Sequence, residues 1–417
     1  MSSLAGMTWA MSSPLTSVPD EPAHILKAVG LYHGQLEGRR VVAKDPLDPV
    51  RPFIYYVVDV PASYARLPKI NSCYYQNRNI SVRCAPSPGS SMRIVRGHPS
   101  AGGYPPLYYS LVGWPSRFLS AVPGVYVMRL VSAVLCGVLF ALAFAVLRGV
   151  LPLWLRLTAV TLSGTPEVWY LAGAVNPNGF EIAAAMLAWA GLIALVLRVR
   201  DGLPVTWRLC AAAGLGLVAL TATRPLSPLF AGIVAVYALA SAGPATVRRI
   251  LRERRAVILL GVGAVAIIAT GLIIVASQQL NTITGGSRLP AYYNVPIRLL
   301  MLFHVWFSQM IAVFGWLEFG PIASPVYGWL MALTVVGALV LLFGRPADAW
   351  RALGLIVITG LGPVLLQYQA IRSSGYYIWQ GATSCRWRSA CRSSWRWRCG
   401  QRGASRAGPA SSGPSPC

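Results

Sequence analysis

The sequence predicts an all-α, polytopic integral membrane protein, on the basis of its composition and the length of its apolar runs. Of its 417 residues, 55% are hydrophobic and only 12% are charged. A soluble globular domain carries about 25% charged residues and a disordered chain has low hydrophobicity, so neither class fits. Several runs of roughly 20 apolar residues are long enough to cross a bilayer as helices.

Eight apolar runs are predicted to be transmembrane helices. They cover residues 130–147, 157–174, 180–197, 209–222, 226–242, 256–276, 326–343 and 352–366. The connections between them alternate between arginine-rich and arginine-poor. Cytoplasmic loops of membrane proteins collect Lys and Arg. We therefore expect a multi-pass plasma-membrane protein whose arginine-rich connections are cytoplasmic and whose residues 116–381 form the transmembrane helical domain.

A further apolar segment, residues 295–317, is interrupted by Arg298, His304 and Gln309. If this segment crossed the membrane, Arg345 and Arg351 would move to the outer side and the alternation of charge would break. We therefore expect it to be an interfacial or re-entrant helix on the outer face.

The formal net charge of +24 does not indicate a nucleic-acid partner. On a soluble protein such a charge would favour nucleic acid, but arginine-rich cytoplasmic connections account for much of it here. Seven of the arginines lie in residues 382–417, which contain no acidic residue.

Residues 15–115 are predicted to form a large external loop ahead of the first clear span. A loop of this length is usually functional. It contains Cys73 and Cys84, and a cysteine pair outside the membrane predicts a disulfide. Cys136 and Cys210 fall inside predicted spans, where a free thiol acts as a small apolar residue.

Both ends of the chain depart from the pattern of the rest. Residues 1–14 resemble the last turns of a spanning helix, so we expect a truncated or misassigned start. Residues 382–417 contain repeated Trp-Arg pairs and no Leu, Ile, Val or Phe, which is typical of GC-rich DNA read in the wrong frame. We expect a frameshift near residue 381; the alternative is a basic amphipathic tail that binds anionic lipid.

The densest group of reactive side chains follows the first helix. Asp20 and Glu21 are adjacent, and His24 lies one helical turn beyond Asp20, so an acid, a base and a metal ligand can share one side of a helix. Acidic residues and proline also suit the first turn of any helix, but that explanation does not account for His24.

Other polar residues stand at the outer ends of the predicted spans. Carboxylates at membrane depth are costly and usually functional, and an arginine between two spans can bind a phosphate or extend to the interface. The candidate substrate-binding residues are Tyr104, Tyr108, Glu167, Glu181 and Arg224.

The chain resembles the GT-C glycosyltransferases, which are membrane enzymes that use polyprenyl-phosphate-linked sugars. It shares an acidic pair after the first helix and a Pro-Pro-Leu-Tyr-Tyr stretch, residues 105–109, before the second. It more closely resembles a family of bacterial, largely actinobacterial, membrane proteins catalogued as domain of unknown function 2142. That resemblance covers residues 9–381 and includes Asn176-Pro-Asn178 and Trp379-Gln-Gly381.

The first resemblance implies a glycosyltransferase that moves a sugar from a polyprenyl-phosphate donor, within the membrane, to an external acceptor. Asp20 or Glu21 would act as general base or bind a divalent cation, and Arg224 would hold the lipid phosphate. The alternative is a non-enzymatic transporter or flippase of a cell-envelope lipid. A transporter predicts carboxylates deep within the spans, whereas these acids cluster at the outer ends.

Overall fold

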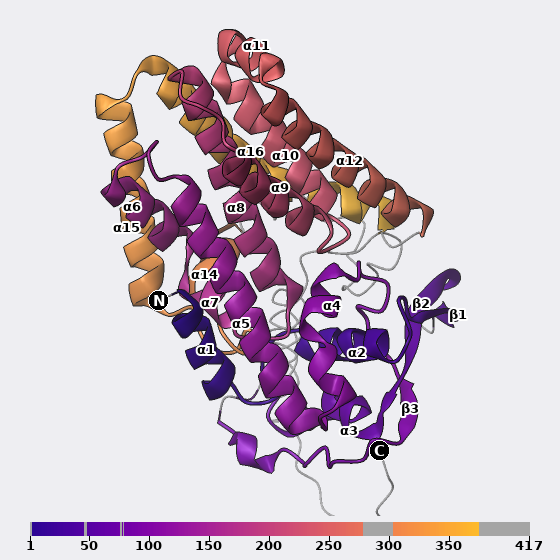
Figure 1. The fold of residues 1–417 in the computed structure, drawn as a ribbon. Helices are drawn as coiled ribbons and strands as arrows, with labels where there is room; N and C mark the ends of the chain where they lie inside the picture. The colour runs from indigo at the N-terminus through magenta and orange to yellow at the C-terminus, as the bar shows by residue number, and fades with distance from the viewer. Residues whose placement is uncertain (1, 46–47, 76, 78, 278–302, 375–417) are drawn as a thin grey trace, which may run out of the picture.

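A computed structural model describes residues 2–45, 48–75, 77, 79–277 and 303–374. Most of the described chain is helical, as predicted, and long helices form an elongated bundle (Figure 1). A smaller part with a β-sheet lies at the lower end of this bundle, and α11 lies at the upper end (Figure 1).

The bundle is built from helices of very different lengths. They are α1 (Ser2–Ser12), α5 (Ala121–Val146), α6 (Leu153–Ser163), α7 (Pro166–Ala172), α8 (Pro177–Arg200), α9 (Trp207–Thr221), α10 (Ser227–Ala242), α11 (Pro244–Arg252), α12 (Arg254–Ala276), α14 (Phe303–Ala312), α15 (Ala323–Phe343) and α16 (Pro346–Ser374).

The smaller part contains short helices and strands from residues 15–117. They are α2 (Glu21–Tyr32), β1 (Arg39–Asp45), β2 (Asp48–Pro61), α3 (Ala62–Ala65), η1 (Leu67–Cys73), η2 (Val82–Cys84), β3 (Ile94–Gly97), α4 (Leu107–Val112) and η3 (Trp114–Arg117).

The predicted total of eight spans is not confirmed. Within the described residues, α5, α8, α12 and α15 are each long and apolar enough to cross a membrane, and α10 with α11 adds a fifth if this bent pair is one span. The predicted spans at 209–222 and 226–242 correspond to α9 and α10, with 15 and 16 residues. A straight crossing of the hydrocarbon core needs about 20 residues.

The predicted span at 157–174 is divided between α6 and α7. Gly164 ends α6, and Pro166 is the first residue of α7. A proline removes a backbone donor and disfavours a helical conformation in the residue before it. The Thr165 hydroxyl instead caps α7 by accepting from the Val168 amide at 3.3 Å.

Small residues let α8 and α9 approach closely. A Cβ on Gly191 would lie 2.5 Å from the Ala213 Cβ, and one on Gly216 would lie 2.6 Å from the Ala188 amide nitrogen. Such contacts between small residues favour close packing of helices in membranes. They fix the position of the turn between α9 and α10, which carries Arg224.

The predicted interfacial segment at 295–317 is described from residue 303 onward. The described part of this segment contains the helix α14, Phe303–Ala312. Residues 295–302 and the predicted frameshifted tail, 382–417, lie outside the described residues.

The three-stranded sheet corrects the all-α prediction. The strands pair antiparallel in the order β1–β2–β3. Residues 53–60 are rich in β-branched and aromatic side chains, which favour strands, and Val58 and Val60 are buried against α2. Gly30 of α2 allows this approach, because a Cβ there would lie 3.1 Å from the Val58 Cβ.

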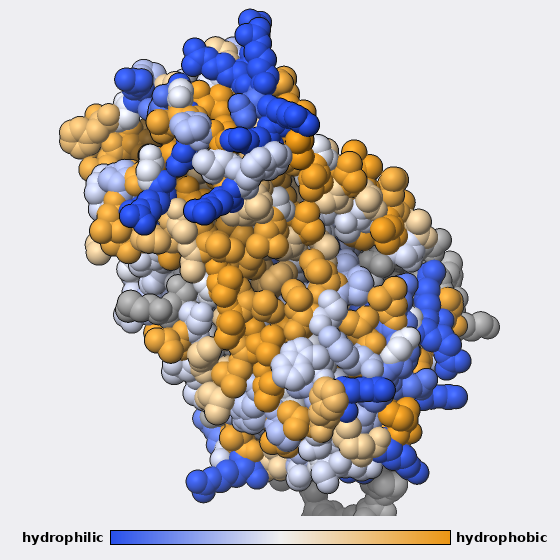
Figure 2. Space-filling model, in the orientation of Figure 1, coloured by the Kyte–Doolittle hydropathy of each residue, from blue (hydrophilic) through white to orange (hydrophobic). Residues whose placement is uncertain are grey.

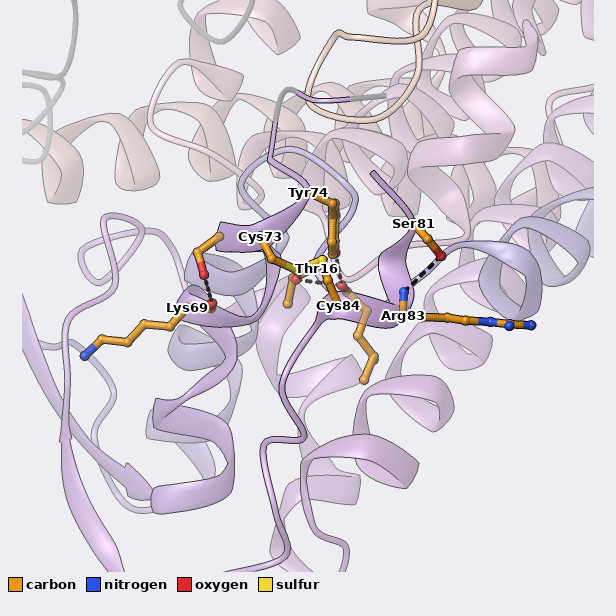
Figure 3. Close-up of a disulfide and its surroundings, with 9 residues drawn as sticks. Thr16, Lys69, Cys73, Tyr74, Ser81, Arg83 and Cys84 are labelled. Atoms are coloured by element: carbon orange, nitrogen blue, oxygen red, sulfur yellow. Dashed lines mark hydrogen bonds between the residues drawn. A yellow bond between two sulfur atoms is a disulfide. The ribbon is translucent and has the colours of Figure 1, made fainter. Parts of the chain in front are cut away.

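The predicted disulfide is confirmed. Cys73 and Cys84 are bonded across a separation of 11 residues, with their Cα atoms 6.1 Å apart, and the bond joins η1 to η2 (Figure 3). Beside it, the Tyr74 hydroxyl donates to the Leu15 carbonyl at 2.7 Å. The disulfide thus steadies the loop that contacts the chain just before α2. Cys136 and Cys210 are free and buried, as expected.

The surface of the bundle is divided into zones of different polarity. Apolar side chains of the peripheral helices are exposed, including Val265 of α12 and Leu341 of α15. Figure 2 shows a band of hydrophobic side chains between hydrophilic side chains at the α11 end and others at the end with the sheet. This pattern fits a helical bundle that contacts lipid around its middle.

A buried ion pair joins the two parts of the molecule. Arg129 of α5 donates to both carboxylate oxygens of Glu21, from Nε at 2.7 Å and from Nη2 at 2.6 Å, and both side chains are fully buried. The same guanidinium donates to the carbonyls of Ser13, at 2.6 Å, and Pro14, at 2.9 Å. The Val175 amide donates to the Glu21 carboxylate at 3.1 Å.

Removing one partner of this ion pair should destabilise the protein strongly. Glu21→Gln leaves the Arg129 charge buried without a counterion, which typically costs about 3–5 kcal/mol. We expect a clear fall in the thermal unfolding temperature of the purified protein in detergent. Asp201→Asn, which breaks the exposed Arg200–Asp201 pair, is the control and should have little effect. An unchanged unfolding temperature for Glu21→Gln would contradict this assignment.

Candidate functional site

A polar cluster lies where the helical bundle meets residues 15–117. Its members come from the start of α2, the segment around α4, the first turns of α8 and the turn between α9 and α10. We call it the junction cluster and define it as Asp20, His24, Tyr104, Tyr109, Glu181, Arg224 and Ser227.

Arg224 and Glu181 form the charged centre of the junction cluster. The Arg224 Nη1 donates to the Glu181 Oε2 at 3.1 Å. The other Glu181 oxygen accepts from the Ser227 hydroxyl at 2.5 Å, and that hydroxyl accepts from the Arg224 amide at 3.0 Å. The Arg224 guanidinium is also hydrogen-bonded to the Tyr104 hydroxyl. Its side chain is still 35% exposed.

Asp20 has an uncommitted carboxylate beside this centre. Its backbone is left-handed, with φ at 61°, a conformation that Asp tolerates better than most residues. It is the N-cap of α2, but its side chain makes no capping hydrogen bond. Part of the residue is exposed to solvent, but desolvation of its carboxyl group by the surrounding protein raises the pKa of that group, while the nearby Arg224 charge opposes the shift. The helix-start explanation therefore does not account for the Asp20 side chain.

His24 lies one turn further along α2 and faces the same group. Its Nδ1 is hydrogen-bonded to the Tyr109 hydroxyl at 2.9 Å, and its ring lies 5.7 Å from that of Tyr104. Burial, and to a smaller extent the Arg224 charge, lowers the pKa of His24 to about 3. The imidazole is therefore neutral at physiological pH, and one ring nitrogen is an acceptor.

Two of the predicted residues point away from the junction cluster. Glu21 is fully occupied by the Arg129 ion pair and the Val175 amide. Tyr108 is buried in the bundle, where its hydroxyl lies 3.0 Å from the Ser132 hydroxyl. Their contacts give both residues a structural role. The two residues of the predicted acidic pair therefore have different surroundings, because neighbouring side chains at a helix start face different directions.

Glu167 also lies elsewhere. It is in the first turn of α7, where its carboxylate is hydrogen-bonded to the backbone of Val313. Its Oε2 is buried and has no partner among the described residues. No contact of the described chain links Glu167 to Arg224 or Asp20.

Three residues of this region were not predicted. Tyr109 holds His24, and Ser227 holds Glu181. Asn178 stands one helical turn before Glu181, so the two share one side of α8, and its Oδ1 is buried without a partner among the described residues. The sequence signals were the Pro-Pro-Leu-Tyr-Tyr stretch, which ends at Tyr109, and the Asn176-Pro-Asn178 stretch. In the second, Asn176 caps α8 by accepting from the Asn178 amide at 2.9 Å.

The junction cluster combines an anion-binding group with a proton acceptor. An arginine suits a phosphate because its planar fork matches the phosphate oxygens, and a carboxylate with a raised pKa is a better general base than an ordinary one. The described residues contain no group of three or more His, Cys, Asp or Glu side chains placed to hold a metal ion.

Comparison with known proteins identifies one family. A family model described as "Predicted membrane protein (DUF2142)" matches residues 4–381, which is most of the chain. No curated protein and no solved structure matches the chain.

Replacing Asp20 should affect stability in the opposite direction from replacing Glu21. Because partial desolvation raises the Asp20 pKa in the folded state, ionisation of Asp20 lowers the stability of the fold as pH rises above about 3.8, the pKa of this group in the unfolded chain. Asp20→Asn cannot ionise and keeps the left-handed backbone accessible. We expect it to unfold at the same or a higher temperature than the wild type at pH 7, measured by thermal unfolding in detergent. A loss as large as that of Glu21→Gln would contradict a functional role for Asp20.

Proposed function

The chain belongs to the DUF2142 family of predicted membrane proteins, and from this membership and the junction cluster we propose that it is a membrane glycosyltransferase of the GT-C type. The proposed donor is a polyprenyl-phosphate-linked sugar, and the proposed site of reaction is the outer face of the plasma membrane. The observation that carries this proposal is the uncommitted carboxylate of Asp20 beside Arg224.

The proposed reaction uses the two charged groups in different roles. Asp20 accepts the proton of an acceptor hydroxyl as the hydroxyl oxygen bonds to the anomeric carbon of the sugar. The bond between this carbon and the phosphate oxygen breaks, and the lipid phosphate leaves with the electron pair. Arg224 stabilises the negative charge on that phosphate, while Glu181 and Tyr104 hold the guanidinium in place.

The proposed orientation places residues 15–115 outside the cell. Two observations support it. The Cys73–Cys84 disulfide is typical of an oxidising compartment. The arginine-rich α11 lies at the end of the bundle opposite the sheet (Figure 1), and arginine-rich connections are typically cytoplasmic. The junction cluster is then on the outer side, where a lipid-linked sugar and an external acceptor can meet.

Asn178 is the proposed contact for the sugar itself. Its buried Oδ1 has no partner in the described chain, and an unpartnered buried polar atom is costly. A sugar hydroxyl can donate or accept a hydrogen bond, so it can pair with either the oxygen or the NH₂ group of the carboxamide. A phosphate oxygen can only accept, and it suits Arg224 instead. The proposed site therefore separates recognition of the sugar from recognition of the phosphate.

Loss of the Asp20 carboxylate should abolish the proposed transfer without unfolding the protein. Removing a general base typically lowers a rate by 10²–10⁴-fold. We therefore expect the rate of sugar transfer by Asp20→Asn to be at least about 100-fold lower than that of the wild type. The measurement is mass spectrometry of lipid extracts from a deletion strain that carries each variant in turn. Unused sugar-phosphate lipid should accumulate in the strain that carries Asp20→Asn. Asp59→Asn, an exposed carboxylate of β2, is the matched control. If both variants restored the lipid profile of the deletion strain equally, the proposed enzymatic role would be refuted and a transporter or flippase would be favoured.

Removing the Asn178 side chain should weaken binding of the sugar but not of the phosphate. Loss of one hydrogen bond to a buried group costs about 1 kcal/mol, so Asn178→Ala should bind polyprenyl-phosphate sugar about fivefold less tightly and bind sugar-free polyprenyl phosphate unchanged. The measurement is a binding titration of the purified protein in detergent with each lipid. Asn176→Ala, which removes the cap of α8 and a hydrogen bond to the Pro19 carbonyl, controls for a general disturbance of the start of α8. Equal affinity of Asn178→Ala and wild type for the sugar lipid would exclude this contact.

A further inference from the structure

We propose that the end of the bundle opposite the sheet carries a binding surface for the headgroups of anionic phospholipids. This surface, called here the α11 basic surface, combines α11, the loop between α8 and α9, and the first residues of α9 and α12. Its exposed members are Leu203, Trp207, Arg208, Arg248, Arg249, Leu251, Arg252 and Arg254.

The orientation of α11 relative to α10 lets its arginines face the lipid headgroups. The axis of α11 is bent by 112° from that of α10, and α12 begins two residues after α11 ends. Thr246 and Ile250 are buried, whereas Arg248, Arg249 and Arg252 are exposed. A short amphipathic helix between two apolar helices lies along the interface, with its basic face toward the headgroups.

Arg255, at the start of α12, holds a second segment next to α11. The Arg255 Nη1 donates to the Val205 carbonyl at 2.6 Å, and its guanidinium lies 5.7 Å from the centre of the Trp207 ring. This holds the loop between α8 and α9 beside the start of α12. Trp207 is 54% exposed and Leu251 is 60% exposed, so apolar side chains stand among the arginines.

The charge of this surface is strongly positive. Asp201 is already paired with Arg200 at 2.8 Å, and Glu253 is the only acid in α11 and its connections to α10 and α12. Figure 2 shows hydrophilic side chains gathered at the α11 end, next to the hydrophobic band. Arginines near a bilayer surface strengthen the binding of anionic lipid.

The exposed tryptophan and leucines favour a lipid over a soluble polyanion. Tryptophan is enriched at membrane interfaces because its ring is apolar and its N–H is polar. A soluble acidic partner would leave Trp207, Leu203 and Leu251 against water or against charge. In a bilayer these side chains reach the acyl boundary while the arginines reach the phosphates.

A lipid titration tests this surface on the full-length purified protein in detergent. We expect added phosphatidylglycerol to raise the thermal unfolding temperature more than phosphatidylcholine does, and the difference to shrink at high salt. The variant Arg248→Gln/Arg249→Gln/Arg252→Gln should lose most of this difference. The control, Arg66→Gln/Lys69→Gln/Arg83→Gln, removes three exposed charges near the disulfide and should retain it.

Two results would overturn the proposal. One is an equal response of the wild type to the two lipids, and the other is a full phosphatidylglycerol response in the α11 triple variant. A poorly folded variant is recognised by its unfolding temperature without added lipid. Retained lipids in native mass spectrometry then provide a second readout, in which phosphatidylglycerol adducts should be depleted in the α11 variant alone.

Discussion

The buried ion pair between Arg129 and Glu21 is the interaction on which the rest of the structure depends. It joins α5 to the start of α2, and its guanidinium also holds the carbonyls that follow α1. A charge at this depth is tolerated only when it is paired and fully hydrogen-bonded. The chain between α1 and α2 therefore has one favourable path, and this path determines where Asp20 lies.

The two neighbouring acids show how one short segment can serve both structure and chemistry. Glu21 satisfies Arg129 with both oxygens and lies out of reach of solvent. Asp20, held in a left-handed conformation at the same helix start, makes no capping bond, and its carboxylate is close enough to Arg224 to feel the arginine's charge. Strained conformations of this kind cluster at functional sites, and the fixed neighbour is what maintains the strain.

The two ends of the bundle have opposite chemical character. The junction cluster combines a free carboxylate, a neutral histidine and a half-exposed arginine beside a disulfide-bearing segment. The opposite end presents arginines with apolar neighbours. The proposed outer-face chemistry and the proposed contact with anionic lipid both follow from this polarity, but they rest on different residues and different contacts.

The sequence by itself determined the membrane class, the apolar helices, the disulfide and five members of the junction cluster, because each depends on composition or on local spacing. Only the tertiary structure decided which of Asp20 and Glu21 faces the cluster, since the choice rests on a contact with Arg129 across 108 residues. It likewise revealed the sheet and the division of the span at Gly164. A local pattern cannot encode such features, because their energy comes from groups brought together only by folding.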